Sequence, residues 1–125
     1  YFPEENVLHA GGVISNDAYP LIDWWTGGWI GGLVNGLETL IGLANADTVI
    51  VPANGPLMTY AELLAMREMY NTIFRRVRDL FMNANSPQET LDAAPTAEFD
   101  ARWGDPDAFV LLAHQSLIPH LAPDA

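Results

Sequence analysis

The chain has 125 residues, of which 50% are hydrophobic and 17% are charged, so it has enough apolar surface for one folded domain and does not have the composition of a disordered segment. Acidic residues number 16 against 5 arginines, with no lysine, and the net charge is −11. This charge argues against nucleic acid and against an anionic membrane surface as partners, because both attract cationic proteins.

The N-terminal part of the sequence predicts one strand and one long loop. Residues 6–10 read N-V-L-H-A, a mostly apolar run that Gly11 ends, and we expect a strand there. Residues 15–28 contain Asn-Asp, Pro and Gly-Gly, which are typical of a loop.

Residues 29–44 predict the first helix, because apolar residues recur three or four positions apart from Ile30 to Ile41. Its glycines each disfavour a helix by about 1 kcal/mol relative to alanine. We therefore expect tertiary packing to hold this helix and the glycines to allow close approach to a sheet. Residues 47–51 predict a short β-branched strand with little alternation, which indicates burial on both faces.

A second, longer helix is predicted after Thr59. Thr59 and Glu62 form a capping box, and an apolar stripe then continues for about six turns. A strand between two amphipathic helices favours the α/β class. Four arginines lie mainly between the apolar positions, and we expect them on a solvated face near acidic neighbours: Arg67, Arg75, Arg76 and Arg78.

The C-terminal part predicts two further helices. Ser86 and Glu89 form a second capping box, with a proline at the first helical position, and predict a short helix up to residue 93. The last helix is expected to start near Asp105 and to end at Pro119.

Two strand-to-loop junctions resemble the C-terminal half of the metallo-β-lactamase fold. The second predicted strand runs into V-P-A-N-G-P at residues 51–56, where the family reads V-P-G-H-G-P and its histidine binds zinc. The first strand runs into A-G-G, where the family has Gly-Asp and the aspartate bridges two metals. The corresponding residues here are Asn54 and Gly12. The segments D-W-W-T-G-G-W at 23–29 and T-A-E-F-D at 96–100 extend the likeness over most of the chain.

This resemblance implies half of an αβ/βα sandwich, that is, a few-stranded sheet with amphipathic helices, followed by a C-terminal helical segment. Residues 1–125 would form a single domain, with the sheet and the two main helices in 1–84 and the helical tail in 85–125. The family's principal metal motif, H-x-H-x-D-H, belongs to the N-terminal half and is absent from this sequence. Since Gly12 and Asn54 replace two further ligands, we expect no catalytic residue and no metal in this chain alone.

Two residues near Gly12 are alternative metal ligands. His9 lies three residues before Gly12 and Asp17 five residues after it, so either side chain can approach the same place. The more ordinary interpretation of His9 is a packed or partly exposed ring. Asn54 is a poor zinc ligand, because a neutral amide lacks the charge and the softness that zinc selects.

Two hypotheses for the function follow from these observations. The first is a degenerate, non-catalytic half domain, or pseudoenzyme, that forms a homodimer in which two copies pack as the two halves of the full fold do. Its interface would contain the apolar face of residues 7–8 and 49–51 together with three tryptophans, Trp24, Trp25 and Trp29.

The second hypothesis is the C-terminal portion of a metal-dependent hydrolase of the ester, lactone or β-lactam class. In that case a complementary N-terminal half supplies the histidine motif, and zinc is the cofactor. The sequence contains no run of about 18 apolar residues that would span a bilayer. It names no substrate, and neither a signal-peptide pattern nor a cysteine assigns it to a compartment.

Overall fold

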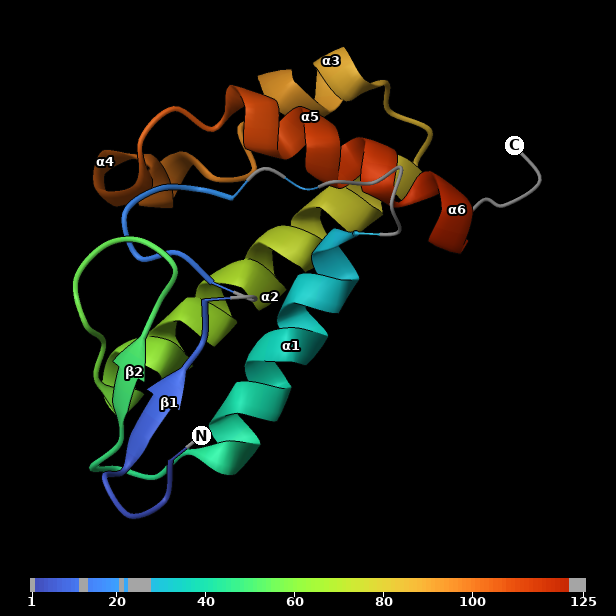
Figure 1. The fold of residues 1–125 in the computed structure, drawn as a ribbon. Helices are drawn as coiled ribbons and strands as arrows, with labels where there is room; N and C mark the ends of the chain where they lie inside the picture. Colours follow the sequence, from blue (N-terminus) through green and yellow to red (C-terminus); the bar gives the residue numbers. More distant parts are fainter. Residues whose placement is uncertain (1, 12–13, 21, 23–27, 122–125) are drawn as a thin grey trace.

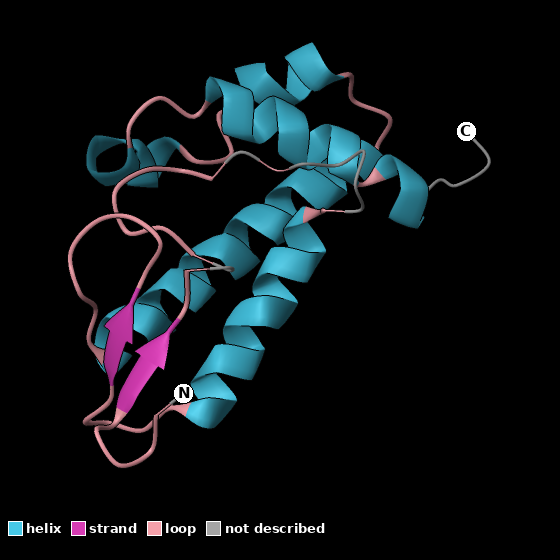
Figure 2. Ribbon diagram, in the orientation of Figure 1, coloured by secondary structure: helices cyan, strands magenta, loops and turns pink. Residues whose placement is uncertain are grey.

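The computed structural model describes residues 2–11, 14–20, 22 and 28–121. The described part is a mixed α/β fold, mostly helical, with a two-stranded parallel sheet (Figure 1, Figure 2). The predicted α/β class is therefore confirmed. The elements in chain order are β1 (Val7–His9), α1 (Ile30–Leu43), β2 (Val49–Val51), α2 (Tyr60–Met82), α3 (Pro87–Asp92), the short 3-10 helix η2 (Ala97–Phe99), α4 (Asp100–Trp103), α5 (Asp107–Ser116) and α6 (Ile118–Leu121).

Strands β1 and β2 pair in parallel, with Val7 opposite Val49 and His9 opposite Val51. A parallel pair needs a long crossover, and here α1 lies in the connection between the two strands. Each strand is two residues shorter than predicted. The free edge of β2 is covered by an antiparallel bridge between Ile50 and Met58.

The sheet has one buried face and one exposed face. Leu8 and Ile50 are 2% and 0% exposed and belong to the same core cluster as residues of α1 and α2. Alternate residues along a strand point to the opposite face, and there Val49 is 39% exposed. The prediction that the second strand is buried on both faces was wrong, because the core packs against one face only.

Helix α1 packs against α2, and its apolar stripe is buried through Ile30, Leu37 and Leu40. The prediction that its glycines allow close approach to a sheet was wrong for Gly31 and Gly32. A Cβ at Gly31 would lie 2.5 Å from the Trp29 ring, and one at Gly32 would lie 3.0 Å from it. These glycines therefore make room for the tryptophan that precedes the helix.

Helix α2 begins at the predicted capping box, in which Thr59 Oγ1 accepts from the Glu62 amide and the Glu62 carboxylate accepts from the Thr59 amide. Three of its four arginines contact carboxylates, as predicted: Arg67 with Glu38 and Glu68, Arg76 with Glu98, and Arg78 with Asp79. Arg75 donates instead to the Thr72 hydroxyl. This surface of α2 is thus neutralised by its own neighbours.

The C-terminal tail packs on α2 at the end away from the sheet (Figure 1). The capping box of α3 is present as predicted. The last predicted helix is divided, because α5 ends at Ser116 and Pro119 lies inside the short α6. Sequence periodicity did not reveal η2 and α4. Contacts from elsewhere hold them, since Asp100 Oδ1 accepts from both Tyr19 and Thr96 at 2.8 Å.

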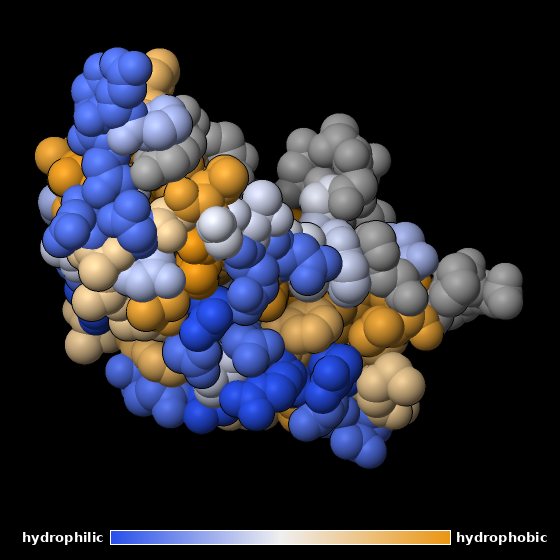
Figure 3. All heavy atoms as spheres, turned by 90° about the horizontal axis from the view of Figure 1, so that it is seen from below, coloured by the Kyte–Doolittle hydropathy of each residue, from blue (hydrophilic) through white to orange (hydrophobic). Residues whose placement is uncertain are grey.

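The surface alternates between polar and apolar areas. Seen from below in Figure 3, strongly hydrophilic residues separate the apolar areas on this face. The largest exposed apolar side chains among the described residues include Phe2, Leu57 and Met82, which are 55%, 61% and 64% exposed. None of the described helices combines the length and the apolar character that crossing a lipid bilayer requires.

Candidate functional site

The loops that follow β1 and β2 meet at one edge of the sheet, because the carboxyl ends of parallel strands point the same way. Two backbone hydrogen bonds join them, Ala53 N–H to Ile14 C=O at 2.9 Å and Asn16 N–H to Asn54 C=O at 2.7 Å. They follow the last bond of the strand ladder, from Ala10 N–H to Val51 C=O at 2.8 Å. In open α/β sheets this edge is where ligands bind. The two predicted ligand positions belong to these loops.

Asn54 is exposed, and its side-chain amide lies 3.5 Å from the Ser15 hydroxyl, which is a long hydrogen bond. Gly12 lies outside the described residues. The neighbouring Gly11 is described, and a Cβ there would contact Ala53 at 3.7 Å. Asn54 therefore helps to join the two loops by hydrogen bonding.

The two alternative ligands are not gathered into a metal site. His9 is exposed, and its ring packs edge-on against Phe2 with the ring centroids 5.5 Å apart. Asp17 is also exposed, next to the buried Asn16. Within the part of the chain that the structure describes, no three His, Asp or Glu side chains are grouped so that they could hold a metal ion.

The exposed face of the sheet is the second candidate site. Val7, His9, Val49 and Val51 share this face, and we call it the outer sheet face. Two backbone hydrogen bonds link the strands, from Val49 N–H to Asn6 C=O and from Ala10 N–H to Val51 C=O. The backbone groups of the even-numbered residues in and beside β1 therefore point toward β2, and those of the odd-numbered residues point toward the opposite edge. Val7 pairs with Phe2 on the opposite edge, where the backbone of His9 has no described partner. Among the described residues, only Phe2 pairs with this edge of β1.

The tryptophan cluster is only partly described, because Trp24 and Trp25 lie outside the described residues. Trp29 is half-buried, and its ring meets Phe74 of α2 edge-on with the ring centroids 6.0 Å apart. It packs against the hydrophobic core. Among the three tryptophans predicted for an interface, Trp29 therefore has a packing role within the chain itself.

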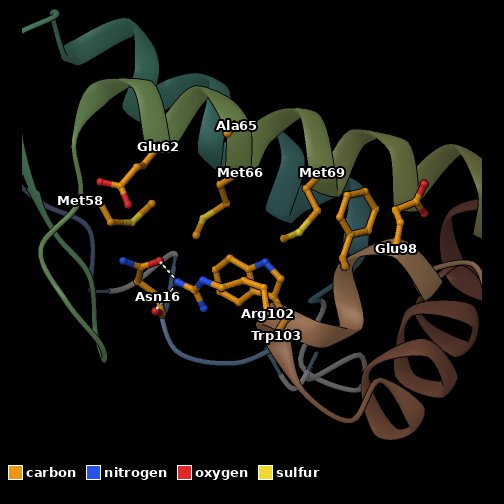
Figure 4. Close-up of a pocket in the computed structure, with 10 residues that line it drawn as sticks. Asn16, Met58, Glu62, Ala65, Met66, Met69, Glu98, Arg102 and Trp103 are labelled. Atoms are coloured by element: carbon orange, nitrogen blue, oxygen red, sulfur yellow. Dashed lines mark hydrogen bonds between the residues drawn. The ribbon is translucent and has the colours of Figure 1, made fainter.

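A third site, which the sequence did not reveal, centres on Asn16. Its side-chain amide donates to Pro56 C=O at 2.9 Å, and its backbone and side-chain oxygens accept from Arg102 Nη2 at 3.1 and 3.0 Å. Beside Arg102, a cavity of about 340 Å³ opens between α2 and α4 (Figure 4). It is lined by Asn16, Met58, Glu62, Ala65, Met66, Met69, Glu98, Phe99, Arg102 and Trp103. No motif indicated this cavity, because its walls come from four separate segments.

Two tyrosines have a raised pKa. Burial raises the pKa of the Tyr19 phenol above its ordinary value of 10.0, and the hydrogen bond to Asp100 raises it further. Burial also raises the pKa of Tyr70 above 10.0. Both hydroxyls therefore stay protonated in the folded chain at a pH where free tyrosine ionises.

We predict that the protein loses stability steeply above about pH 10, because there the unfolded chain releases tyrosine protons that the folded chain retains. Below this pH both states keep their tyrosine protons, so the folded chain keeps its full stability. Urea unfolding between about pH 8 and about pH 11 measures the loss. Tyr70→Phe should reduce it, whereas Tyr60→Phe, at the partly exposed start of α2, should leave it unchanged. Equal alkaline loss in wild type and Tyr70→Phe would contradict the prediction.

Compared with protein-family models and with curated protein sequences, the chain matches none of them.

Proposed function

We propose that this chain is the C-terminal half of a metallo-β-lactamase-like sandwich, that it is not catalytic by itself, and that it functions by self-association. A second copy would cover the outer sheet face. The observation that carries this proposal is the asymmetry of the sheet, in which Leu8 and Ile50 are buried while Val49 on the opposite face is 39% exposed. In a sandwich, another layer covers the second face of the sheet. A half sandwich with a bare second face therefore needs a partner to cover that face.

The meeting of the two loops supports the assignment to this fold. In the metallo-β-lactamase family, which the chain resembles, each of the two corresponding junctions carries a metal ligand. Here Asn54 and Asn16 join the corresponding loops at 2.7 Å, and the loop after β1 contains Gly12. The arrangement of the strands is compatible with a former metal site, whereas the residue types are not.

The same residues argue against hydrolysis by the chain alone. A catalytic zinc needs three protein ligands and an open position for water. Asn54 offers a neutral amide, which lies at hydrogen-bonding distance from Ser15. We therefore expect the isolated chain to hold no zinc, and less than about one tenth of an equivalent by mass spectrometry after mild dialysis. About one equivalent of tightly held zinc would contradict the proposal.

We expect light scattering coupled to size exclusion to give twice the 13.7 kDa of one chain at micromolar concentration. Such a dimer would bury about 800 Å² per subunit, the size of a standard interface. Val49→Asp should shift the mass to that of a monomer, because it places a charge in the apolar interface. The matched control is Met82→Asp, which changes another exposed apolar residue at the end of α2 away from the sheet and should leave the dimer intact.

The alternative is a metal-dependent hydrolase of the ester, lactone or β-lactam class, in which an N-terminal half with the H-x-H-x-D-H motif covers the outer sheet face. The edge of β1 opposite β2 favours it, since a further strand can pair with the backbone of His9. The same experiment separates the two functions. A mass near that of one chain that is unchanged on tenfold concentration would reject self-association and favour the alternative.

A further inference from the structure

The cavity between α2 and α4 has walls suited to an apolar ligand. Met58, Met66 and Met69 line the cavity and are 3%, 3% and 6% exposed, and Met66 and Met69 lie opposite Trp103 across it (Figure 4). Methionine side chains are flexible and polarisable, so they adapt to ligands of irregular shape. A volume of about 340 Å³ is at the lower end of the range for small-molecule sites.

One end of the cavity carries a cation that no described carboxylate neutralises. Arg102 stacks on Trp103, with its guanidinium carbon 4.1 Å from the ring centroid. Its Nη2 donates to the two oxygens of Asn16, both of which are neutral. Its Nε and Nη1 have no hydrogen-bond partner among the described residues. Three of the other four arginines are paired with carboxylates, so this environment is unusual in a chain with 16 acidic residues.

Both carboxylates that line the cavity accept hydrogen bonds within the chain. Glu62 accepts from the Thr59 amide at the start of α2. Glu98 pairs with Arg76 on the other side of the cavity. Arg102 is therefore the cation at the cavity that has no paired carboxylate among the described residues, and a guanidinium binds a carboxylate through charge-assisted hydrogen bonds.

We infer that this cavity binds a medium-chain alkyl carboxylate. The carboxylate accepts a charge-assisted hydrogen bond from Nη1 of Arg102, and the alkyl chain lies between the methionines and Trp103. Binding involves no covalent step, and it does not depend on the proposed association, because no residue of the outer sheet face lines the cavity.

Calorimetric titration with decanoate, below its micelle concentration, tests this inference. We expect saturable binding at one site per chain, and binding of decanol that is weaker by about tenfold or more, because the alcohol has no charge to pair with Arg102. Arg102→Gln should weaken the binding of decanoate by a similar factor and leave the affinity for decanol unchanged. The matched control is Arg75→Gln, which removes an exposed cation that contacts Thr72 and should change neither affinity.

A second variant keeps the test decisive if Arg102→Gln destabilises the loop around Asn16. Ala65 is exposed on α2 and lines the cavity, so Ala65→Phe should fill the cavity without removing a described side-chain hydrogen bond. It should abolish the binding of decanoate and of decanol. The inference is overturned by equal affinities for the two ligands, by unchanged decanoate binding in Arg102→Gln or Ala65→Phe, or by no saturable binding of decanoate to the wild-type chain.

Discussion

Phe109→Ala is expected to lower the free energy of unfolding by about 4 kcal/mol, the cost typical of removing a buried aromatic ring. Phe109 is 1% exposed and belongs to α5. Its ring stacks on Tyr19 at 5.0 Å and meets Tyr70 edge-on at 6.0 Å. The three rings join the loop after β1, helix α2 and the tail. A cavity at this place would therefore weaken the packing of three segments together.

Urea denaturation followed by circular dichroism measures this loss, at one protein concentration because self-association changes apparent stability. Phe109→Leu should cost about half as much, since it retains most of the apolar volume. Phe2→Ala is the control. Phe2 is 55% exposed, so its removal should cost less than about 1 kcal/mol. A loss below about 1 kcal/mol for Phe109→Ala would show that the three rings do not hold the tail.

Local signals in the sequence predicted the two long helices and the short α3. The capping boxes at Thr59 and Ser86 are made within four residues, so they can be recognised without knowledge of the fold. The spacing of apolar residues likewise predicted which side of α2 is buried. The buried Met69, which lines the cavity, was not part of the predicted stripe. That stripe comprised Leu63, Met66, Tyr70, Ile73, Phe74, Val77, Leu80 and Phe81.

Features that depend on contacts between distant segments could not be predicted. The α4 helix has only four residues, and Tyr19 binds it through Asp100 across 81 positions of sequence. Arg102 contacts Asn16 from 86 positions away. Short helices of this kind have no periodic signal of their own, and tertiary contacts determine them. The cavity was missed for the same reason, whereas the predicted site at Asn54 followed from a local motif.

The junction of the two loops leaves little free space at Gly55. This residue has a backbone φ of 91°, a conformation that residues other than glycine rarely adopt. A Cβ there would lie 2.6 Å from the carbonyl carbon of Asn16 and 2.7 Å from its oxygen. Both contacts are with backbone, so the overlap is relieved only if the loops separate. Separation would stretch the bonds of Asn16 to Asn54 and to Pro56.

Gly55→Ala is therefore expected to lower the free energy of unfolding by about 3 kcal/mol, from backbone strain and steric overlap together. It should also weaken decanoate binding, because Asn16 positions Arg102. The matched control is Gly42→Ala near the end of α1, where a Cβ meets nothing within 4 Å. That change should stabilise the protein by up to about 1 kcal/mol, as alanine favours a helix over glycine. Urea unfolding of both variants thus gives shifts of opposite sign. A Gly55→Ala variant as stable as wild type would mean that the two loops are not packed together as closely as the structure has them.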